Sequence, residues 1–130
     1  MPTGDNPTQK KALVVDDDIA MVEYVAAVLR RAGYQVETAG DGMTALEMYR
    51  VGEFDAVVCD IRMPKLSGIS FLKNLRLNAQ SRCRVVLLSS MDDPILRREA
   101  IDCGAVAYLV KPASSKAITD AVTGGMAAQP

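Results

Sequence analysis

Short apolar runs alternate along this chain with longer segments in which apolar residues recur every three or four positions. The runs predict strands that are buried on both faces, and the recurring pattern predicts amphipathic helices. Because strand and helix alternate five times, we expect an α/β fold: a doubly wound, five-stranded parallel sheet with five helices covering both of its faces. The expected strands are residues 12–15, 34–38, 57–60, 85–88 and 107–110.

Each expected helix carries an apolar stripe and is bounded by capping or helix-ending residues. The polar stretch 78–84 is expected to lead out of the third helix. The expected caps are Asp17 or Asp18, then Asp92-Asp93 before Pro94, then Ser114 or Ser115, and the expected helix ends are Gly33, Gly52, Gly104 and Gly124-Gly125. The stripes are Val22, Val25, Ala26 and Leu29, then Ala45, Leu46 and Tyr49, then Phe71, Leu72 and Leu75, then Leu96, Ala100 and Cys103, and finally Ile118 and Val122.

Length and charge restrict the class of protein. A chain of 130 residues is long enough for one hydrophobic core and too short for two. Lys and Arg number 15 against 16 Asp and Glu, without a basic tract, so neither direct nucleic-acid binding nor a membrane surface is favoured. We expect a disordered leader at 1–10, a folded domain at 11–123 and a flexible tail at 124–130.

Cysteine usage and hydrophobicity indicate the compartment. Cys59, Cys83 and Cys103 are odd in number, lack C-x-x-C spacing, and have no histidine to join them. Free thiols in a reducing environment are therefore expected. No apolar run approaches the roughly 20 residues of a membrane span, and the first residues lack the hydrophobic segment of a signal peptide. We expect a cytoplasmic protein with no membrane insertion.

Polar residues of complementary chemistry follow four of the expected strands. The acidic run Asp16 to Asp18 follows the first, Asp60 ends the third, Ser89 the fourth and Lys111 the fifth. The carboxyl ends of parallel strands meet at one edge of a doubly wound sheet, so we expect these side chains to share a site. Clustered carboxylates without histidine or paired cysteine suit a hard cation. Mg²⁺ is the expected cofactor, because it normally takes one or two carboxylates with phosphate oxygens and waters.

This set of residues is what phosphoryl transfer to an aspartate requires. We assign Asp60 as the nucleophile, because it ends the central strand between the acidic pair and the lysine. Lys111 is expected to contact one phosphoryl oxygen, and Ser89 to donate a hydrogen bond to another. Repulsion among the carboxylates is expected to raise one or more of their pKa values, so that a divalent ion is needed to keep Asp60 ionised.

Four segments resemble the receiver domains of two-component response regulators, of which the single-domain chemotaxis regulator is the smallest form. The resemblance covers about residues 11–122. It rests on "VVDD" at 14–17, "DIRMP" at 60–64, "LLSS" at 87–90 and "GAVAYLVKP" at 104–112. It implies the flavodoxin-like strand order 2-1-3-4-5. It also implies a cis peptide bond between Lys111 and Pro112, which is physically plausible because X-Pro bonds have only a small trans preference.

The resemblance also implies roles for single residues of the metal and phosphoryl site. Asp16 and Asp17 match the metal-binding acidic pair, and Asp60 matches the phosphoacceptor. Arg62 matches the residue whose backbone carbonyl ligates the metal, and Lys111 matches the family's lysine. Many receivers have a smaller or neutral residue in place of Arg62, so the lifetime of the phosphoryl group in this chain is an open question.

The implied signalling mechanism is a shift in conformation after phosphorylation. Ser89 matches the switch hydroxyl, which moves toward the phosphoryl group, and Tyr108 matches the aromatic residue that then turns inward. The surface formed by the fourth helix, fifth strand and fifth helix changes as a result. Residues expected on that surface are Arg97, Arg98, Tyr108 and Lys116.

The resemblance implies a signalling domain that catalyses only its own phosphorylation and dephosphorylation. The implied partners are a sensor histidine kinase or phosphotransfer protein, which donates the phosphoryl group, and a downstream effector protein or output domain. The sequence leaves open whether the chain forms a homodimer. The short last helix suggests a marginal end or a domain taken from a longer protein.

Three other functions fit the sequence less well. A phosphohydrolase of the haloacid dehalogenase type would use Asp16 as nucleophile and Asp18 as acid, but such an enzyme also needs an acidic pair beyond its lysine, and only Asp120 follows Lys111. A phosphate-independent interaction module is disfavoured by the intact acids, hydroxyl and lysine. Mononucleotide binding is disfavoured because no glycine-rich loop follows the first strand.

Overall fold

The computed structural model describes residues 9–63, 65–77 and 83–124, which form one parallel sheet with helices on both faces. The strands are β1 (Lys11–Val15), β2 (Gln35–Ala39), β3 (Ala56–Asp60), β4 (Arg84–Ser89) and β5 (Ala107–Val110). The helices are α1 (Ile19–Arg31), α2 (Gly42–Val51), α3 (Gly68–Leu77), α4 (Pro94–Asp102) and α5 (Ser115–Thr123). The strand order is β2-β1-β3-β4-β5 with all pairings parallel, so the predicted fold class and order are confirmed.

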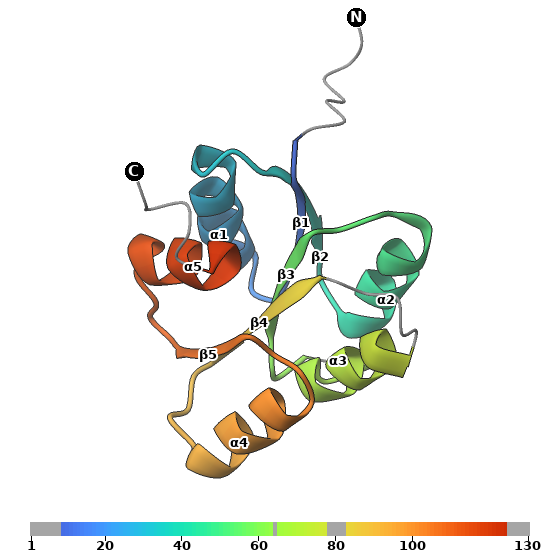
Figure 1. Ribbon diagram of the computed structural model, residues 1–130, viewed down its shortest axis with the longest axis vertical. Helices are drawn as coiled ribbons and strands as arrows, with labels where there is room; N and C mark the ends of the chain where they lie inside the picture. Colours follow the sequence, from blue (N-terminus) through green and yellow to red (C-terminus); the bar gives the residue numbers. More distant parts are fainter. Residues whose placement is uncertain (1–8, 64, 78–82, 125–130) are drawn as a thin grey trace, which may run out of the picture.

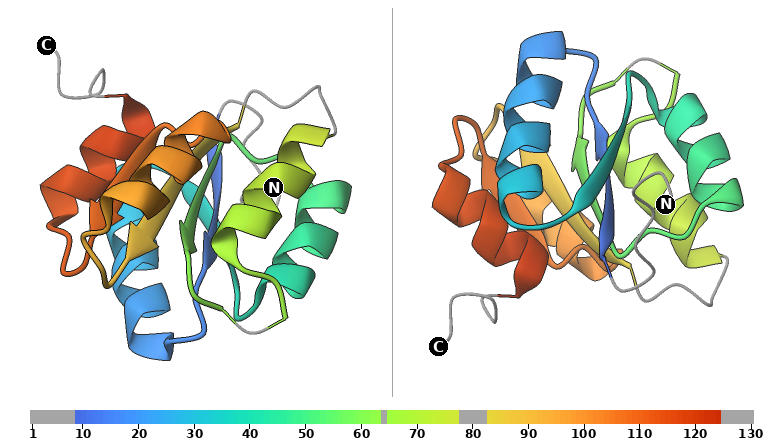
Figure 2. Two further views of the ribbon diagram at one scale, coloured as in Figure 1. Left: turned by 90° about the horizontal axis from the view of Figure 1, so that it is seen from below. Right: turned by 90° about the horizontal axis from the view of Figure 1, so that it is seen from above.

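The helices form two layers, one on each side of the sheet. Figure 1 places α1 beside α5 on one side and α2 beside α3 on the other, and these two pairs are also in contact. The further views in Figure 2 show the sheet between the layers. This arrangement leaves the carboxyl edge of the sheet uncovered by helices, which is where the loops that carry the polar residues begin.

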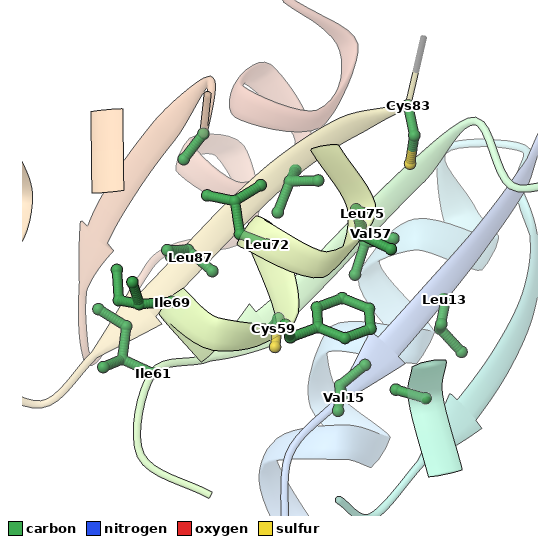
Figure 3. Close-up of a cluster of buried hydrophobic side chains, with 14 of the residues drawn as sticks. Leu13, Val15, Val57, Cys59, Ile61, Ile69, Leu72, Leu75, Cys83 and Leu87 are labelled. Atoms are coloured by element: carbon green, nitrogen blue, oxygen red, sulfur yellow. The ribbon is translucent and has the colours of Figure 1, made fainter. Parts of the chain in front are cut away.

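Two hydrophobic cores fill the spaces between sheet and helices. Successive strand residues point to opposite faces, so Val57 packs toward α2, α3 and α4, whereas Val58 packs toward α1 and α5. Figure 3 shows the first core, where Leu72 and Leu75 of α3 lie over the strands. Because both faces of the central strands are buried, these strands read as continuous apolar runs.

Local capping chemistry decides the helix boundaries. Asp18, not Asp17, caps α1 by accepting hydrogen bonds from the backbone N–H groups of Ala20 and Met21. Ser114 caps α5 in the same way, and Gly124 ends that helix in the left-handed conformation. The sequence left two residues open for each of these caps, and the structure selects one.

Six of the ten strand boundaries differ from the prediction by one residue, and the contacts explain two of these differences. β2 begins at Gln35 rather than Tyr34, because the Tyr34 N–H still bonds to the Leu29 carbonyl at the end of α1. β4 begins at Arg84, which the sequence places in a polar exit. Its backbone pairs with Ala56, and its guanidinium reaches α5, where it donates to the Ala121 carbonyl at 3.2 Å.

The domain boundaries stay predictions. Within the expected leader, the structure describes only Gln9, whose side chain donates to the Gly33 carbonyl, and Lys10, whose carbonyl accepts from Gln35 N–H. Residues 1–8 and 125–130 of the expected leader and tail lie outside the described part.

Cys59, Cys83 and Cys103 are free thiols. No helix in the described ranges is long and apolar enough to cross a membrane.

Candidate functional site

Residues from three strand ends meet around Asp60. Asp60 is the last residue of β3, the central strand, and is only 7% exposed; Asp16, which follows β1, is 4% exposed. The Lys111 ammonium, after β5, lies 3.1 Å from Asp16 Oδ2 and 3.5 Å from Asp60 Oδ2. The lysine thus bridges two buried carboxylates. The peptide bond between Lys111 and Pro112 is cis, as the resemblance implied.

The three acidic residues after β1 lie in different surroundings. Asp16 faces Lys111 and also accepts a hydrogen bond from the Asp18 backbone N–H at 3.0 Å. Asp17 is exposed and lies next to the other acids. Asp18 turns away to cap α1. The backbone therefore leaves two of the three acids, Asp16 and Asp17, beside Asp60.

The site has the oxygen ligands of a hard divalent cation. One carboxylate oxygen from each of Asp16, Asp17 and Asp60 lies within 4.8 Å of the others. Oxygens that share one Mg²⁺ are separated by up to about 4 Å, so the cluster needs only a small contraction to hold the ion. The donor set is all oxygen, which suits Mg²⁺ and not a softer metal. These residues fit the predicted ion.

The pKa values of Asp60 and Lys111 are both raised. Burial raises the pKa of Asp60, and the charge of Asp16 adds to this effect, whereas Lys111 and a hydrogen bond from the Arg62 backbone N–H oppose it. Burial alone would lower the pKa of Lys111, but its hydrogen bond to Asp16 and the two carboxylate charges outweigh burial. The predicted rise in a carboxyl pKa is confirmed, with burial rather than repulsion as its main cause.

The expected switch residues lie close to Met91, in the loop after β4. Ser89 is buried at the end of β4, and its Oγ accepts a hydrogen bond from Met91 N–H at 3.0 Å. Tyr108 of β5 is also buried, with its hydroxyl donating to the Met91 carbonyl at 2.7 Å. Met91 therefore connects the two residues. Nothing in its side-chain type marks it in the sequence, and only its position two residues after Ser89 could have suggested it.

Arg62 lies at the mouth of the site. Its side chain is exposed and donates from Nη2 to Met91 Sδ at 3.6 Å, between the loops that follow β3 and β4. A groove of about 730 Å³ opens there, and its lining includes Asp17, Arg62, Lys73, Met91 and Glu99. Lys73 and Glu99 form an ion pair of 3.7 Å between α3 and α4. Sequence reasoning missed both, because single charges on helix surfaces carry no distinctive spacing.

Close backbone packing fixes the loop that follows Asp60. A Cβ added at Gly68 would lie 2.6 Å from the Asp60 carbonyl oxygen and 2.9 Å from Ile61 Cα. A Cβ at Gly42 would overlap the Leu66 carbonyl oxygen. Both positions require glycine, so the start of α3 and the start of α2 pack directly against the segment that carries the site.

The arrangement of strands, acids and lysine agrees with what comparison with known proteins finds. The family model described as the response regulator receiver domain matches residues 12–123. The chain belongs to this family. Such domains are the parts of two-component response regulators that are phosphorylated on an aspartate. This membership favours the receiver interpretation over the haloacid dehalogenase interpretation, in which Asp16 would be the nucleophile.

Receiver relatives of different overall length are similar to this chain. The chemotaxis protein CheY of Treponema pallidum (strain Nichols) is 32% identical over 127 residues, which is 94% of this chain and 88% of that protein. The transcriptional regulatory protein ZraR of Klebsiella oxytoca is 42% identical over 106 residues, or 80% of this chain and 23% of that protein. The chain thus spans about a quarter of the length of ZraR.

A solved structure of a receiver complex is also similar. The CheX-CheY-BeF3-Mg+2 complex from Borrelia burgdorferi contains a chain that superposes with a TM-score of 0.83 at 28% identity, covering 90% of this chain and 89% of that one. A receiver of this fold therefore occurs with a magnesium ion and a fluoride of beryllium in one structure.

Proposed function

We propose that this receiver domain accepts a phosphoryl group on Asp60 and uses the modification to change the surface formed by α4, β5 and α5. The observation that carries the proposal is the position of Lys111, which bridges Asp16 and Asp60 at 3.1 and 3.5 Å. A carboxylate nucleophile beside a fixed cation is what transfer of an anionic group requires.

In the transfer step, an Asp60 carboxylate oxygen attacks the phosphorus atom of the donor. A P–O bond forms to Asp60 while the bond from phosphorus to the donor atom breaks, and that atom leaves with the electron pair. Lys111 contacts one phosphoryl oxygen, and the Ser89 hydroxyl donates to another. In the later hydrolysis, water attacks the phosphorus and gives up a proton, the P–O bond to Asp60 breaks with its electron pair left on the Asp60 carboxylate, and inorganic phosphate leaves. The groove beside Arg62 provides the approach for donor and water.

Asp16, Asp17, Asp60 and the backbone carbonyl of Arg62 are the residues that would hold Mg²⁺ for this chemistry. When bound, the ion would neutralise charge on the phosphoryl oxygens and on the clustered carboxylates. The separation of the acid oxygens, within 4.8 Å, supports this assignment, as does the magnesium ion in the similar complex from Borrelia burgdorferi. Asp16 is held by Lys111 and the Asp18 N–H, so it acts as the less mobile member of the acidic pair.

The change in conformation passes through the loop after β4. When the Ser89 hydroxyl moves to the phosphoryl group, it gives up the hydrogen bond from Met91 N–H. Tyr108 already lies inward in this structure, with its hydroxyl donating to the Met91 carbonyl, so the ring keeps this position when the loop moves. The surface altered by this motion includes Arg97, Arg98 and Lys116, and it is the surface that a downstream effector protein or output domain would contact.

The phosphodonor is a sensor histidine kinase or a phosphotransfer protein, and the domain itself serves in signalling and not in turnover of a metabolite. Family membership supports this role. A cytoplasmic location is proposed on the same ground, since these donors present the phosphoryl group inside the cell.

The deciding experiment is incubation with acetyl phosphate and Mg²⁺, followed by intact mass measurement and peptide mapping. We expect one acid-stable, base-labile phosphoryl group on Asp60 in the wild type and none in Asp60→Asn, which keeps the shape of the side chain. Labelling of Asp16 in the variant at the wild-type rate would replace this proposal with hydrolase-like chemistry. Wild-type protein that gained no phosphoryl group would instead indicate a phosphate-independent interaction module.

A further inference from the structure

Arg97, in the first turns of α4, makes three contacts that converge on Tyr108 and its surroundings. Its Cζ lies 4.7 Å from the centroid of the Tyr108 ring, and its Nη1 donates to the Tyr108 carbonyl at 3.1 Å. Its Nη2 donates to Asp92 Oδ1, also at 3.1 Å, in the loop that precedes α4. The planar guanidinium allows one side chain to face a ring and to donate in two directions.

Arg97 contacts the ring face and the backbone carbonyl of Tyr108, while the Tyr108 hydroxyl is held by the loop after β4. Tyr108 is only 4% exposed, and its hydroxyl donates to the Met91 carbonyl at 2.7 Å. Arg97 lies over the ring and bonds to the backbone of the same residue. Any outward rotation of Tyr108 must therefore break both the hydroxyl bond to Met91 and the cation–π contact with Arg97.

The next arginine of α4, Arg98, makes a different kind of contact. Arg98 has a side chain that is 82% exposed, and it pairs with Asp102 one turn along the same helix. Exposed pairs of that kind contribute little to stability. The Arg97 side chain is 45% exposed, and its contacts join α4 to β5 and to the loop after β4.

We infer that Arg97 is a positioning residue that holds Tyr108 inward and so favours the conformation of the α4 and β5 surface that goes with phosphorylation. The inference rests on the proposed function, because it takes Ser89 as the moving hydroxyl. Met91 lies between the two residues. Its N–H donates to Ser89 Oγ, a bond that is given up when Ser89 moves, and its carbonyl accepts from Tyr108, a bond that keeps the ring inward. Arg97, Tyr108, Met91 and Ser89 thus form a continuous set of contacts from the helix surface to the site.

Linkage gives this arrangement a measurable consequence. Holding Tyr108 inward and binding a phosphoryl group are taken to favour the same conformation. Loss of Arg97 lowers the population of that conformation, and the affinity for a phosphoryl group must then fall by the same factor. A cation–π contact together with a charged hydrogen bond at a half-exposed position corresponds to a factor of about 3 to 10. The effect acts through Tyr108, since Arg97 itself contacts Tyr108 and Asp92 and not Asp60.

The first arm of the test needs no phosphodonor. The full chain is labelled with 3-fluorotyrosine, and the fluorine NMR signal of Tyr108 is assigned by its disappearance in Tyr108→Phe. We expect Arg97→Ala to move this signal toward the position of a solvent-exposed tyrosine, Arg97→Lys to move it partway, and the matched control Arg98→Ala to leave it in place. Melting temperatures verify that each variant is folded, and Arg97→Lys serves if Arg97→Ala is not.

The second arm measures binding of beryllium fluoride in the presence of Mg²⁺ as a probe for the phosphoryl group. We expect the apparent Kd to increase about 3- to 10-fold in Arg97→Ala and to stay unchanged in Arg98→Ala. An unmoved Tyr108 signal in folded Arg97→Ala would overturn the inference, and so would a moved signal with unchanged affinity. If the wild type bound no beryllium fluoride, the proposed function would fall, and the first arm would still decide whether Arg97 positions Tyr108.

Discussion

The ammonium nitrogen of Lys111 lies 3.1 Å from Oδ2 of Asp16, although 95 residues separate the two along the chain. In the order β2-β1-β3-β4-β5, the lysine after β5 reaches past the ends of β4 and β3 to the acid after β1. Asp60, at the end of β3, lies between these two residues, and its Oδ2 is 3.5 Å from the same nitrogen. One positive and two negative charges are therefore gathered at this point.

Replacing Lys111 with Met keeps the volume of the side chain and removes its charge. Phosphorylation by acetyl phosphate should slow by about 10²- to 10³-fold, because a fixed cation no longer stabilises the transferred group. Stability should fall by about 1–3 kcal/mol, less than for a fully buried pair, because the Lys111 side chain is 21% exposed. Labelling rates and urea unfolding measure the two effects. Lys116→Met, which removes an exposed pair on α5, is the control, and a wild-type rate in Lys111→Met would contradict the assignment.

The raised pKa of Asp60 predicts a pH dependence of stability without metal. A carboxyl whose pKa is higher in the folded than in the unfolded state costs stability once it ionises, so the free energy of unfolding falls as pH rises above about 4 and through the folded pKa. Asp60→Asn should abolish this loss and melt at a higher temperature than the wild type at pH 7. Melting curves from pH 3 to 7 in EDTA test this.

The control for the pH series is Asp102→Asn, whose side chain is largely exposed on α4. Its melting temperature should follow the wild-type pH curve in parallel. An Asp60→Asn curve that also ran parallel to the wild type would show that the Asp60 carboxylate has no unusual cost in the folded protein.

Mg²⁺ should raise the melting temperature, because an ion that binds only the folded state stabilises it by about 2.7 kcal/mol at a hundred times its Kd. Asp17→Ala should lose most of this gain, since it removes one of the three carboxylates that lie within 4.8 Å of one another. Asp18→Asn is the matched control from the same acidic run. Asparagine caps helices well, and Asp18 serves as the cap of α1. Equal magnesium responses in both variants would argue against the site.

Arg62 should prolong the phosphorylated state. Its side chain extends over the mouth of the site toward Met91, where it obstructs the in-line approach of water. The same charge could also stabilise the transition state of hydrolysis, but Mg²⁺ and Lys111 already neutralise most of that charge. Arg62→Asn should therefore shorten the phosphoryl lifetime about tenfold, the effect of about 1.4 kcal/mol in the barrier.

A dephosphorylation time course in Mg²⁺ measures that lifetime. Lys65→Asn is the matched control, because Lys65 is an exposed cation in the same loop and has a φ of 73°, which asparagine tolerates. An unchanged or longer lifetime in Arg62→Asn would mean that charge stabilisation of the transition state outweighs obstruction.

Gly68→Ala should displace the backbone of Asp60 and Ile61 and so disturb the site. The added methyl group would lie 2.6 Å from the Asp60 carbonyl oxygen, so the β3–α3 segment must shift. We expect a loss of about 1–3 kcal/mol despite the better helix propensity of alanine, together with a weaker magnesium response. Gly40→Ala is the control, because no atom outside its immediate neighbours lies within 4 Å of the added Cβ. Equal stability and magnesium response in the two variants would contradict this prediction.

Features that depend on nearby residues could be predicted from the sequence. The strand runs at 57–60 and 107–110 and the cap at the start of α4 follow from burial pattern and hydrogen-bonding chemistry within a few positions. Parallel strands bring their carboxyl ends to one edge. The sequence alone therefore groups Asp16, Asp60 and Lys111 at one site.

Features that depend on distant contacts were decided by the tertiary structure. Three adjacent acids are equivalent in sequence, but the turn into α1 directs Asp18 to the helix end and Asp16 to Lys111. Arg84 looks like a loop residue because its charge suggests exposure, whereas its backbone belongs to β4 and its long side chain reaches α5. The contacts of Met91 and the placement of Arg97 over Tyr108 need the register of β4 against β5 and the packing of α4. Hydrophobic periodicity specifies which face of an element is buried, but not which side chain of a neighbouring element it meets there.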